Sequence, residues 1–431
     1  MKNFKLLLIL TIFLQFSCEE DPTSTLPSNP QSLSSAVSDQ QVFLKWEAPG
    51  NTGNPALKEY SIYRGRNDNN YMKIGVTDIN TQDFYDYNVT NNIAYNYYVT
   101  ASNDDGESDP SNKIIAIPHI LGTNGQILSM AIYQNSLIVG GDFSQAGGIS
   151  ANNIAKWNGT SWSPMGTGIS STVYAIEVSG DDLYASDTFN GGISKWNGSQ
   201  WIPLSSGVNV EIFSIKKVGN DLYAGGVFTQ IGSLNTNYIA KWNGSNWIAL
   251  GNGVNSSVFS IASLNNEVFI GGDFTQATGI VANHIVKWNG SSWATLGTGV
   301  NARVNSICFK SNEIYVGGFF TLAGGVSANK IALWNGISWS AVGTDLNNSV
   351  SSILYDNSTL YAGGDFYSNS GGVSIWNNSS WSPLGSPFGS GNVKNIILYG
   401  NNVYAAGYFL HINSISMGNI SKWDGSEWKG F

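Results

Sequence analysis

The sequence predicts an all-β protein in which a β-sandwich is followed by a seven-bladed β-propeller with four-stranded blades. The composition favours many short strands joined by tight turns, since the 431 residues include 50 Gly and 13% aromatic residues. Short alternating runs separated by turn-forming residues fill residues 30–118. Seven pairs of Trp, the members of each pair five residues apart, recur through residues 119–431. A chain of this length is expected to form at least two domains.

Residues 1–17 have the composition of a targeting segment. Lys2 and Lys5 precede an apolar run over residues 6–16, which is too short to span a membrane as a permanent helix. The run ends next to Cys18, and acidic residues follow this cysteine. The segment resembles the signals of bacterial lipoproteins, in particular the surface-export signals of Bacteroidota lipoproteins. This resemblance implies that Cys18 is lipidated and anchors the exported protein in the outer membrane, exposed at the cell surface; a plain secretory signal is the alternative.

The next two segments are a linker and the expected sandwich. Residues 18–29 are acidic, rich in Pro, Ser and Thr, and without hydrophobic periodicity, which predicts a flexible tether. In residues 30–118, apolar residues such as Leu44 and Trp46 alternate along short runs. This region resembles a fibronectin type III domain. The resemblance implies that Trp46 fills the core and that Tyr95 forms the tyrosine corner, and a spacer role is favoured for the domain.

The paired Trp residues mark a repeat of seven units in residues 119–431. The first members of successive pairs are 39 to 47 residues apart, and a period in the mid-forties is typical of a four-stranded propeller blade. In one unit, strands are expected at residues 258–264, 267–274, 284–288 and 293–296. An Asn-Gly turn lies between most paired Trp residues, and both turn residues reach positive φ at little cost, so the two rings are expected to face each other across a hairpin. The pairs are Trp157 with Trp162, Trp196 with Trp201, Trp242 with Trp247, Trp288 with Trp293, Trp334 with Trp339, Trp376 with Trp381, and Trp423 with Trp428.

A Gly-Gly pair ends the second expected strand of most units, ahead of the Trp residues. This arrangement resembles the kelch and galactose-oxidase type of propeller, with Trp where kelch repeats usually have Tyr. The resemblance implies the architecture and little about the ligand. The second unit departs from the pattern, because residues 185–189 contain no glycine pair. A Phe follows in every unit and is expected to pack in the core: Phe143, Phe189, Phe228, Phe274, Phe320, Phe366 and Phe409.

The composition argues against several classes of function. A net charge of −9 and a pI of about 4.8 disfavour binding to nucleic acid. The three His residues are scattered, so no ligand spacing supports a galactose-oxidase-like copper site or another metal site. Arg303 is the single Arg after residue 118, which excludes the arginine triad of sialidases. Catalytic residues, a metal and a cofactor are therefore not expected, although carboxylates remain candidates for glycoside chemistry.

Loop lengths place the candidate binding residues on one face of the propeller, because the connections after the second and fourth strands of each unit are the longer ones. Residues just before each first strand are expected to encircle the channel mouth, where a ligand-binding role competes with a structural one. Those candidates are Gln126, Thr172, Glu211, Ser257, Arg303, Ser349 and Asn392. Acids after the glycine pair are expected either to contact a ligand or Ca²⁺ or, as the favoured interpretation, to cap their own turns. These acids are Asp142, Asp187, Asp273 and Asp365.

Three further expectations concern packing. Glu177 and Lys216 hold the same strand position in adjacent units, where other units have apolar residues, and they should form an ion pair because an unpaired buried charge is costly. Cys308 is expected to be a small buried residue, without a disulfide partner if Cys18 is lipidated. Residues 119–122 are a candidate fourth strand for the last unit, and how the ring closes is left open.

The sequence favours a cell-surface lipoprotein that acts as a non-catalytic binding or adhesion module through the long-loop face of the propeller. The expected ligand is a glycan or another surface protein. A monomer is expected, attached to the membrane through its N-terminal lipid only. The alternatives are a secreted carbohydrate-active enzyme on a propeller scaffold and a structural envelope component. A convergent pair of carboxylates in a pocket on the long-loop face would favour the enzyme.

Overall fold

The computed structural model consists of β-strands and connecting turns. It describes residues 25–38, 40–66, 70–91, 93–119, 121–188, 192–205, 211–356, 359–365, 372–386, 388, 391–409, 411–412 and 415–431. Within these ranges there is no α-helix, and accordingly no helix that could cross a membrane. The predicted signal segment and Cys18 lie outside the described residues. The chain divides into two compact units, one ending at Pro118 and the other beginning at His119.

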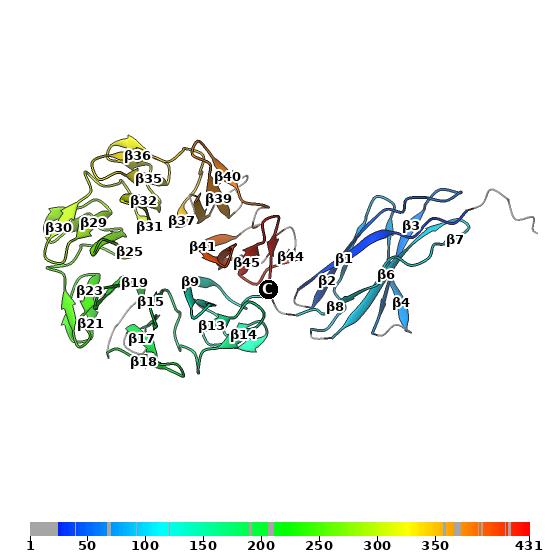
Figure 1. Ribbon diagram of the computed structural model, residues 1–431, viewed down its shortest axis with the longest axis horizontal. Helices are drawn as coiled ribbons and strands as arrows, with labels where there is room; N and C mark the ends of the chain where they lie inside the picture. Colours follow the sequence, from blue (N-terminus) through cyan, green and yellow to red (C-terminus); the bar gives the residue numbers. More distant parts are fainter. Residues whose placement is uncertain are drawn as a thin grey trace, which may run out of the picture. The chain divides into compact units, whose positions relative to one another are not determined.

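The first unit consists of two antiparallel sheets (Figure 1). Trp46 is buried in its core, with its ring edge-on to Tyr60 at a centroid distance of 5.6 Å. The Tyr95 hydroxyl accepts the Thr90 N–H at 3.0 Å, which is the bond expected of a tyrosine corner. The strands are β1 (Gln31–Ser38), β2 (Gln41–Glu47) and β5 (Asp83–Asp86) in one sheet, and β4 (Tyr71–Asp78), β3 (Glu59–Gly65), β6 (Tyr95–Asn103), β7 (Gly106–Glu107) and β8 (Ile114–Ala116) in the other.

The second unit contains seven four-stranded antiparallel sheets, called sheet 1 to sheet 7, each formed by strands in chain order. Sheet 1 consists of β9 (Ile127–Tyr133), β10 (Ser136–Gly141), β13 (Ile154–Trp157) and β14 (Trp162–Pro164); sheet 2 of β15 (Ile176–Ser179), β16 (Asp182–Asp187), β17 (Gly192–Trp196) and β18 (Trp201–Pro203); sheet 3 of β19 (Ile212–Val218), β20 (Asp221–Gly226), β23 (Ile239–Trp242) and β24 (Trp247–Ala249); and sheet 4 of β25 (Val258–Leu264), β26 (Glu267–Gly272), β29 (Ile285–Trp288) and β30 (Trp293–Thr295). Sheet 5 consists of β31 (Val304–Lys310), β32 (Glu313–Gly318), β35 (Ile331–Trp334) and β36 (Trp339–Ala341); sheet 6 of β37 (Val350–Asp356), β38 (Thr359–Gly364), β39 (Val373–Trp376) and β40 (Trp381–Pro383); and sheet 7 of β41 (Asn392–Tyr399), β42 (Asn402–Tyr408), β45 (Ile420–Trp423) and β46 (Trp428–Lys429).

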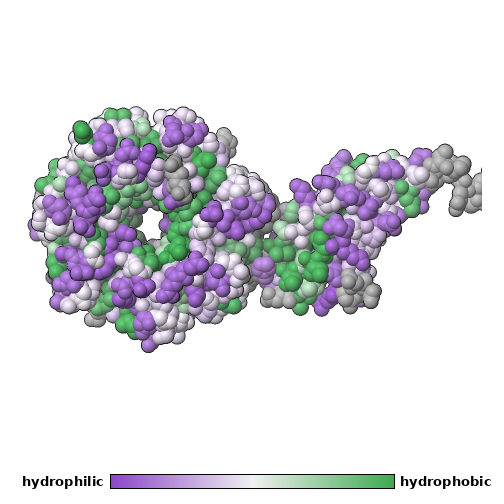
Figure 2. Space-filling model, in the orientation of Figure 1, coloured by the Kyte–Doolittle hydropathy of each residue, from purple (hydrophilic) through white to green (hydrophobic). Residues whose placement is uncertain are grey.

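The first strands of the seven sheets lie next to one another in order, and β41 of sheet 7 lies next to β9 of sheet 1. Figure 1 shows these strands around a central opening, which is visible as a hole in Figure 2. Between neighbouring first strands, serine hydroxyls accept backbone N–H groups; Ser214 Oγ, for example, accepts the Ile261 N–H at 2.9 Å. The Phe that follows the second strand is buried wherever it is described, at Phe143, Phe228, Phe274, Phe320 and Phe409. Phe189 and Phe366 lie outside the described residues.

The paired Trp residues face each other across the hairpin between the third and fourth strands, as predicted. In all seven sheets the two Trp residues are register partners, and their ring centroids lie 4.9 to 5.6 Å apart. The Asn of the turn contributes through its side chain: Asn289 Oδ1 accepts the N–H groups of Ser291 and Ser292 at 3.0 and 2.9 Å. Only Gly290 takes a positive φ, of 100°. The expectation of positive φ at both turn residues is therefore wrong for this turn.

Two-stranded hairpins occupy the connection between the second and third strands in five sheets, where only loops were predicted. Each strand has two residues, which is too short for a hydrophobic alternation to show in the sequence. The hairpins are β11 (Gln145–Ala146) with β12 (Ile149–Ser150), β21 (Gln230–Ile231) with β22 (Leu234–Asn235), β27 (Gln276–Ala277) with β28 (Ile280–Val281), β33 (Leu322–Ala323) with β34 (Val326–Ser327), and β43 (His411–Ile412) with β44 (Ile415–Ser416).

Sheet 7 meets sheet 1 through residues at the start and the end of the second unit. The Gly122 N–H donates to the Phe431 carbonyl at 2.8 Å, and the Thr123 N–H donates to the Gly418 carbonyl at 2.7 Å. The Phe431 ring lies 4.8 Å from the Trp157 ring of sheet 1. All four strands of sheet 7 come from residues 392–429. Residues 119–122 therefore do not supply its fourth strand, which was one of the possibilities left open by the sequence.

Glu177 and Lys216 form the predicted ion pair between sheets 2 and 3. Lys216 Nζ lies 2.9 Å from Glu177 Oε1, and the same carboxylate accepts the Lys217 N–H at 3.0 Å. Burial raises the pKa of Glu177, and the Lys216 ammonium opposes this effect. Cys308 holds the corresponding position of sheet 5 and is a free cysteine, but it is only partly buried, so the prediction of a buried residue holds in part. Its contacts with apolar residues raise the pKa of the thiol to about 12 through desolvation.

We expect Lys216→Met to destabilise the protein more at pH 7 than at pH 4. Without its partner, the buried Glu177 carboxylate is uncompensated; because the Lys216 side chain is 33% exposed, we expect a loss of about 2 kcal/mol at pH 7, below the range for fully buried pairs. A pKa that is raised in the folded state means that stability falls as the pH rises through it. Urea unfolding at both pH values measures the difference. The double variant with Glu177→Gln should regain most of the free energy of unfolding that Lys216→Met loses at pH 7. An equal loss in Lys216→Met at both pH values would contradict the prediction.

Candidate binding site in the central channel

A cavity of about 410 Å³ lies at the centre of the second unit and is lined mainly by the first strands. Each of the seven sheets contributes the residue two positions before the conserved Ile or Met of the first strand. This position was not singled out from the sequence, although it varies between apolar, polar and charged residues when the repeats are aligned. The residues at this position in sheets 1 to 7 are Leu128, Tyr174, Phe213, Phe259, Asn305, Ser351 and Lys394.

Aromatic rings form one side of the cavity. The Tyr174 and Phe213 rings meet edge-on at 5.2 Å, and the Phe213 and Phe259 rings are stacked at 5.0 Å with an interplanar angle of 8°. The Arg303 guanidinium carbon lies 4.0 Å from the Phe259 ring centroid, which is close enough for a cation–π interaction. These contacts give the cavity a continuous apolar wall that ends at a positive charge.

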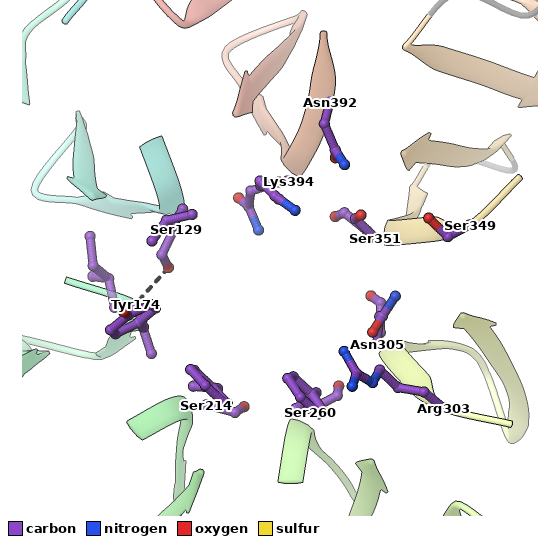
Figure 3. A pocket seen from close by; sticks show the side chains of 18 of the residues that line it. Ser129, Tyr174, Ser214, Ser260, Arg303, Asn305, Ser349, Ser351, Asn392 and Lys394 are labelled. Atoms are coloured by element: carbon purple, nitrogen blue, oxygen red, sulfur yellow. Dashed lines mark hydrogen bonds between the residues drawn. The ribbon is translucent and has the colours of Figure 1, made fainter. Parts of the chain in front are cut away.

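Polar side chains form the opposite side of the cavity (Figure 3). Asn305 Nδ2 donates to the Val350 carbonyl at 2.8 Å, which fixes its orientation. Asn392 Oδ1 is buried and has no hydrogen-bond partner among the described residues. Burial lowers the pKa of Lys394, and the Asp365 carboxylate opposes this effect. Ser349 and Ser351 add hydroxyl groups between these side chains.

Arg303 and Asp273, both predicted candidates, contact each other across adjacent sheets. Arg303 Nε donates to Asp273 Oδ1 at 2.9 Å, and Nη2 donates to Oδ2 at 2.5 Å. Asp273 therefore binds the guanidinium of the next sheet, and the favoured expectation that it caps its own turn is wrong. No sequence pattern indicates this contact, because the two residues are 30 positions apart and belong to different repeats.

Asp187 does not hold the same repeat position as the other three predicted acids. Ile176 pairs with Ala185 in sheet 2 as Ile215 pairs with Ala224 in sheet 3, so Asp187 takes the place of the second glycine, Gly226. Its side chain is buried and accepts hydrogen bonds from the hydroxyls of Ser171 and Ser194 at 3.3 and 3.0 Å. The missing glycine pair in this unit caused the misalignment by one residue.

The predicted mouth residues divide into two groups. Arg303, Ser349 and Asn392 line the cavity, whereas the other four are not among its lining residues. In residues of both groups the backbone has a further role, since the carbonyl of the mouth residue accepts the N–H of the residue after the glycine pair. Asp142 N–H, for example, donates to the Gln126 carbonyl at 2.9 Å. The same bond joins Val227 to Glu211, Asp273 to Ser257, Phe319 to Arg303 and Asp365 to Ser349.

The arrangement offers hydrogen-bonding and stacking groups rather than a set of reactive groups. No Asp, Glu or His side chain is found among the residues that line the cavity. In the described part of the chain, no group of three His, Cys, Asp or Glu side chains is arranged to hold a metal ion. The cavity can therefore provide an aromatic surface, two cations and several polar side chains to a molecule that enters it.

Comparisons with known proteins reach only parts of the chain. No protein-family model matches it. A stretch of 116 residues, 27% of the chain, is 29% identical to Exoglucanase B of Cellulomonas fimi, and this match covers a tenth of that protein's length. An Fn3-like protein from Clostridium thermocellum is 23% identical over 21% of the chain and 92% of that protein, with a TM-score of 0.19. The computationally designed Ika8 protein is 15% identical over 72% of the chain and 87% of that protein, with a TM-score of 0.46. The chain thus has fibronectin type III-like neighbours.

Proposed function

We propose that the seven sheets of residues 119–431 are the blades of a β-propeller, and that this propeller is a non-catalytic module that binds a glycan in its central channel. The order of neighbouring first strands and the contacts of Phe431 with sheet 1 support a closed ring. The single observation that carries the binding function is the cavity, in which an aromatic wall faces polar side chains. Sugars present both an apolar ring face and hydroxyl groups, so such a cavity complements them.

The remaining parts of the proposal rest on the sequence. Lipidation at Cys18 would anchor the exported protein in the outer membrane. Of the predicted tether, residues 18–29, the part before Thr25 would act as the tether, because Thr25 and Ser28 bond to Asn54 and Asn51 of the first unit. The unit with fibronectin type III-like neighbours would then serve as a spacer. The protein would act as a monomer at the cell surface and would not bind nucleic acid, given its net charge of −9.

A carbohydrate-active enzyme is the second candidate function, and the partial match to Exoglucanase B favours it. Glycoside hydrolysis by the common mechanism requires two carboxyl groups that flank the bond to be cleaved. The described lining of the cavity provides none. The binding function is therefore the better supported of the two.

Blocking the channel tests the proposal. Ser351→Trp would fill the cavity from β37, whereas Ser340→Trp adds the same ring to an exposed position on β36. We expect the whole chain to bind a defined group of glycans on an array, Ser351→Trp to lose this binding at least about tenfold, and Ser340→Trp to retain it. Binding that is unchanged in Ser351→Trp would overturn the channel as the site, and an array without any bound glycan would overturn the glycan ligand.

A further inference from the structure

We infer that the ligand of the channel is a sugar ring that carries a carboxylate, which deepens the proposed function and rests on it. The first reason is the charge of the cavity. The whole chain has a net charge of −9, but the lining of the cavity contains Arg303 and Lys394 and no acidic residue. A cavity with this lining in an acidic protein attracts an anion.

The two cations are not equally compensated. Arg303 is held by both oxygens of Asp273. Lys394 makes no hydrogen bond or ion pair among the described residues, and its electrostatic interaction with Asp365 does not outweigh the burial that lowers its pKa. The Lys394 side chain is half-buried, and a carboxylate bound next to its ammonium would supply a bonded partner of opposite charge.

Asn392 adds a requirement for a hydrogen-bond donor. Asn392 and Lys394 lie two residues apart on β41, and both line the cavity. The buried Asn392 Oδ1 has no partner in the described part of the chain, and a buried acceptor without one is costly. A carboxylate alone cannot donate to it, whereas a sugar hydroxyl can. The same molecule should therefore offer an acid group and a hydroxyl group at neighbouring positions.

The aromatic wall completes the match. Phe213 and Phe259 line the cavity and give it an apolar surface, against which the apolar face of a sugar ring can pack. A volume of about 410 Å³ lies within the range of small-molecule sites, which begins at about 300 Å³. A simple phosphate or sulfate would leave this wall without contacts, and a sulfate would also leave Asn392 Oδ1 without a donor. A neutral sugar would leave Lys394 without an anion.

Matched acid and neutral sugars test the inference. The whole chain would be titrated calorimetrically with tri-galacturonic acid, with the methyl ester of the same trisaccharide, with sialyllactose and with lactose. We expect at least one acid to bind about tenfold or more tightly than its neutral counterpart. Comparing tri-galacturonic acid with sialyllactose distinguishes a uronic acid from a sialic acid as the source of the carboxylate. Raising the salt concentration should weaken the binding of the acid only.

Two lysine variants show whether the preference arises in the channel. Lys394→Met should abolish the preference for the acid while retaining the binding of the neutral sugar, because the aromatic wall remains. Lys422→Met changes a lysine on β45 of the same sheet that does not line the cavity, and it should keep the preference. Circular dichroism and thermal unfolding would verify that both variants fold.

The possible failures are distinguishable. Acid and neutral sugars that bind equally well, with binding lost in Ser351→Trp, would overturn the carboxylate and leave the channel as a glycan site. A preference that persists in Lys394→Met would overturn the role of the cavity in recognising the acid. If no sugar of this set binds, a carboxylated sugar is overturned as the ligand, and the glycan array decides separately on the proposed function.

Discussion

Replacing Gly272 by alanine is expected to lower the free energy of unfolding of the second unit by about 3 kcal/mol, because a methyl group has no space there. A Cβ at this position would lie 2.1 Å from the Ser257 carbonyl oxygen, which is a backbone atom that accepts the Asp273 N–H at 2.9 Å. The clash can be relieved only if the first strand moves away and this bond is lost. The second glycines of other sheets meet the same contact, at 2.0 to 2.1 Å: Gly141, Gly226, Gly318 and Gly407.

Two glycine variants serve as controls for this prediction. In Gly271→Ala the new Cβ would meet the Val304 side chain rather than backbone, and sheet 7 already has Ala406 at the corresponding position, so a loss of about 1 kcal/mol is expected. Gly50 lies in the first unit, and a Cβ there meets no atom within 4 Å, so Gly50→Ala should change the free energy of unfolding of the second unit by less than about 0.5 kcal/mol. Denaturant unfolding followed by Trp fluorescence reports the second unit, which contains fourteen of the fifteen Trp residues. A larger loss in Gly271→Ala than in Gly272→Ala would contradict the prediction.

Sheet 2 shows how the fold accommodates a side chain at this position. Asp187 stands where the second glycine stands elsewhere, and the first strand β15 begins only at Ile176. The Ser186 hydroxyl accepts the N–H groups of Tyr174 and Ala175 at 2.7 and 3.1 Å, while the Ser186 N–H donates to the Ala175 carbonyl at 2.9 Å. The Ser171 hydroxyl accepts the Thr188 N–H at 3.0 Å. A side chain at the second-glycine position is therefore tolerated where several serine hydroxyls replace the lost backbone bonds.

The features that repeat along the chain could be predicted from the sequence. The spacing of the Trp pairs predicted the hairpin register in every sheet, and β25 has the predicted bounds, Val258–Leu264. The Glu177–Lys216 pair was also predictable, because alignment of the repeats put two charges at one otherwise apolar position in adjacent sheets. These predictions succeed because hydrophobic periodicity and turn chemistry act over short distances along the chain.

The contacts between different repeats could not be predicted in the same way. Asp273 and Arg303 hold different positions in their repeats, so no alignment brings them together, and only the packing of sheet 4 against sheet 5 does. The channel-lining positions, such as Phe259 and Lys394, lie in strands whose burial pattern is mixed, because some side chains pack against neighbouring sheets and others line the cavity. Alternation alone does not distinguish these two environments.

Trp339→Ala is expected to lower the free energy of unfolding by about 3 to 5 kcal/mol, as is typical when a buried Trp is removed. The Trp339 side chain is 5% exposed, and its ring lies 5.3 Å from the Trp334 ring across the hairpin. Its indole Nε1 also donates to the Leu296 carbonyl of the preceding sheet at 2.8 Å. The residue therefore stabilises both its own hairpin and the contact between sheets 4 and 5, and denaturant unfolding should show the loss.

The indole hydrogen bond can be separated from the packing by comparing two Trp→Phe variants. Trp339→Phe removes the donor to Leu296, whereas the buried Trp201 Nε1 of sheet 2 has no partner among the described residues. Both variants lose the same part of the ring, so the difference between them reports the hydrogen bond, and Trp339→Phe should destabilise by about 1 kcal/mol more than Trp201→Phe. Because corresponding bonds to a carbonyl of the preceding sheet are made by Trp293, Trp381 and Trp428, equal losses in the two variants would mean that packing alone joins the neighbouring sheets.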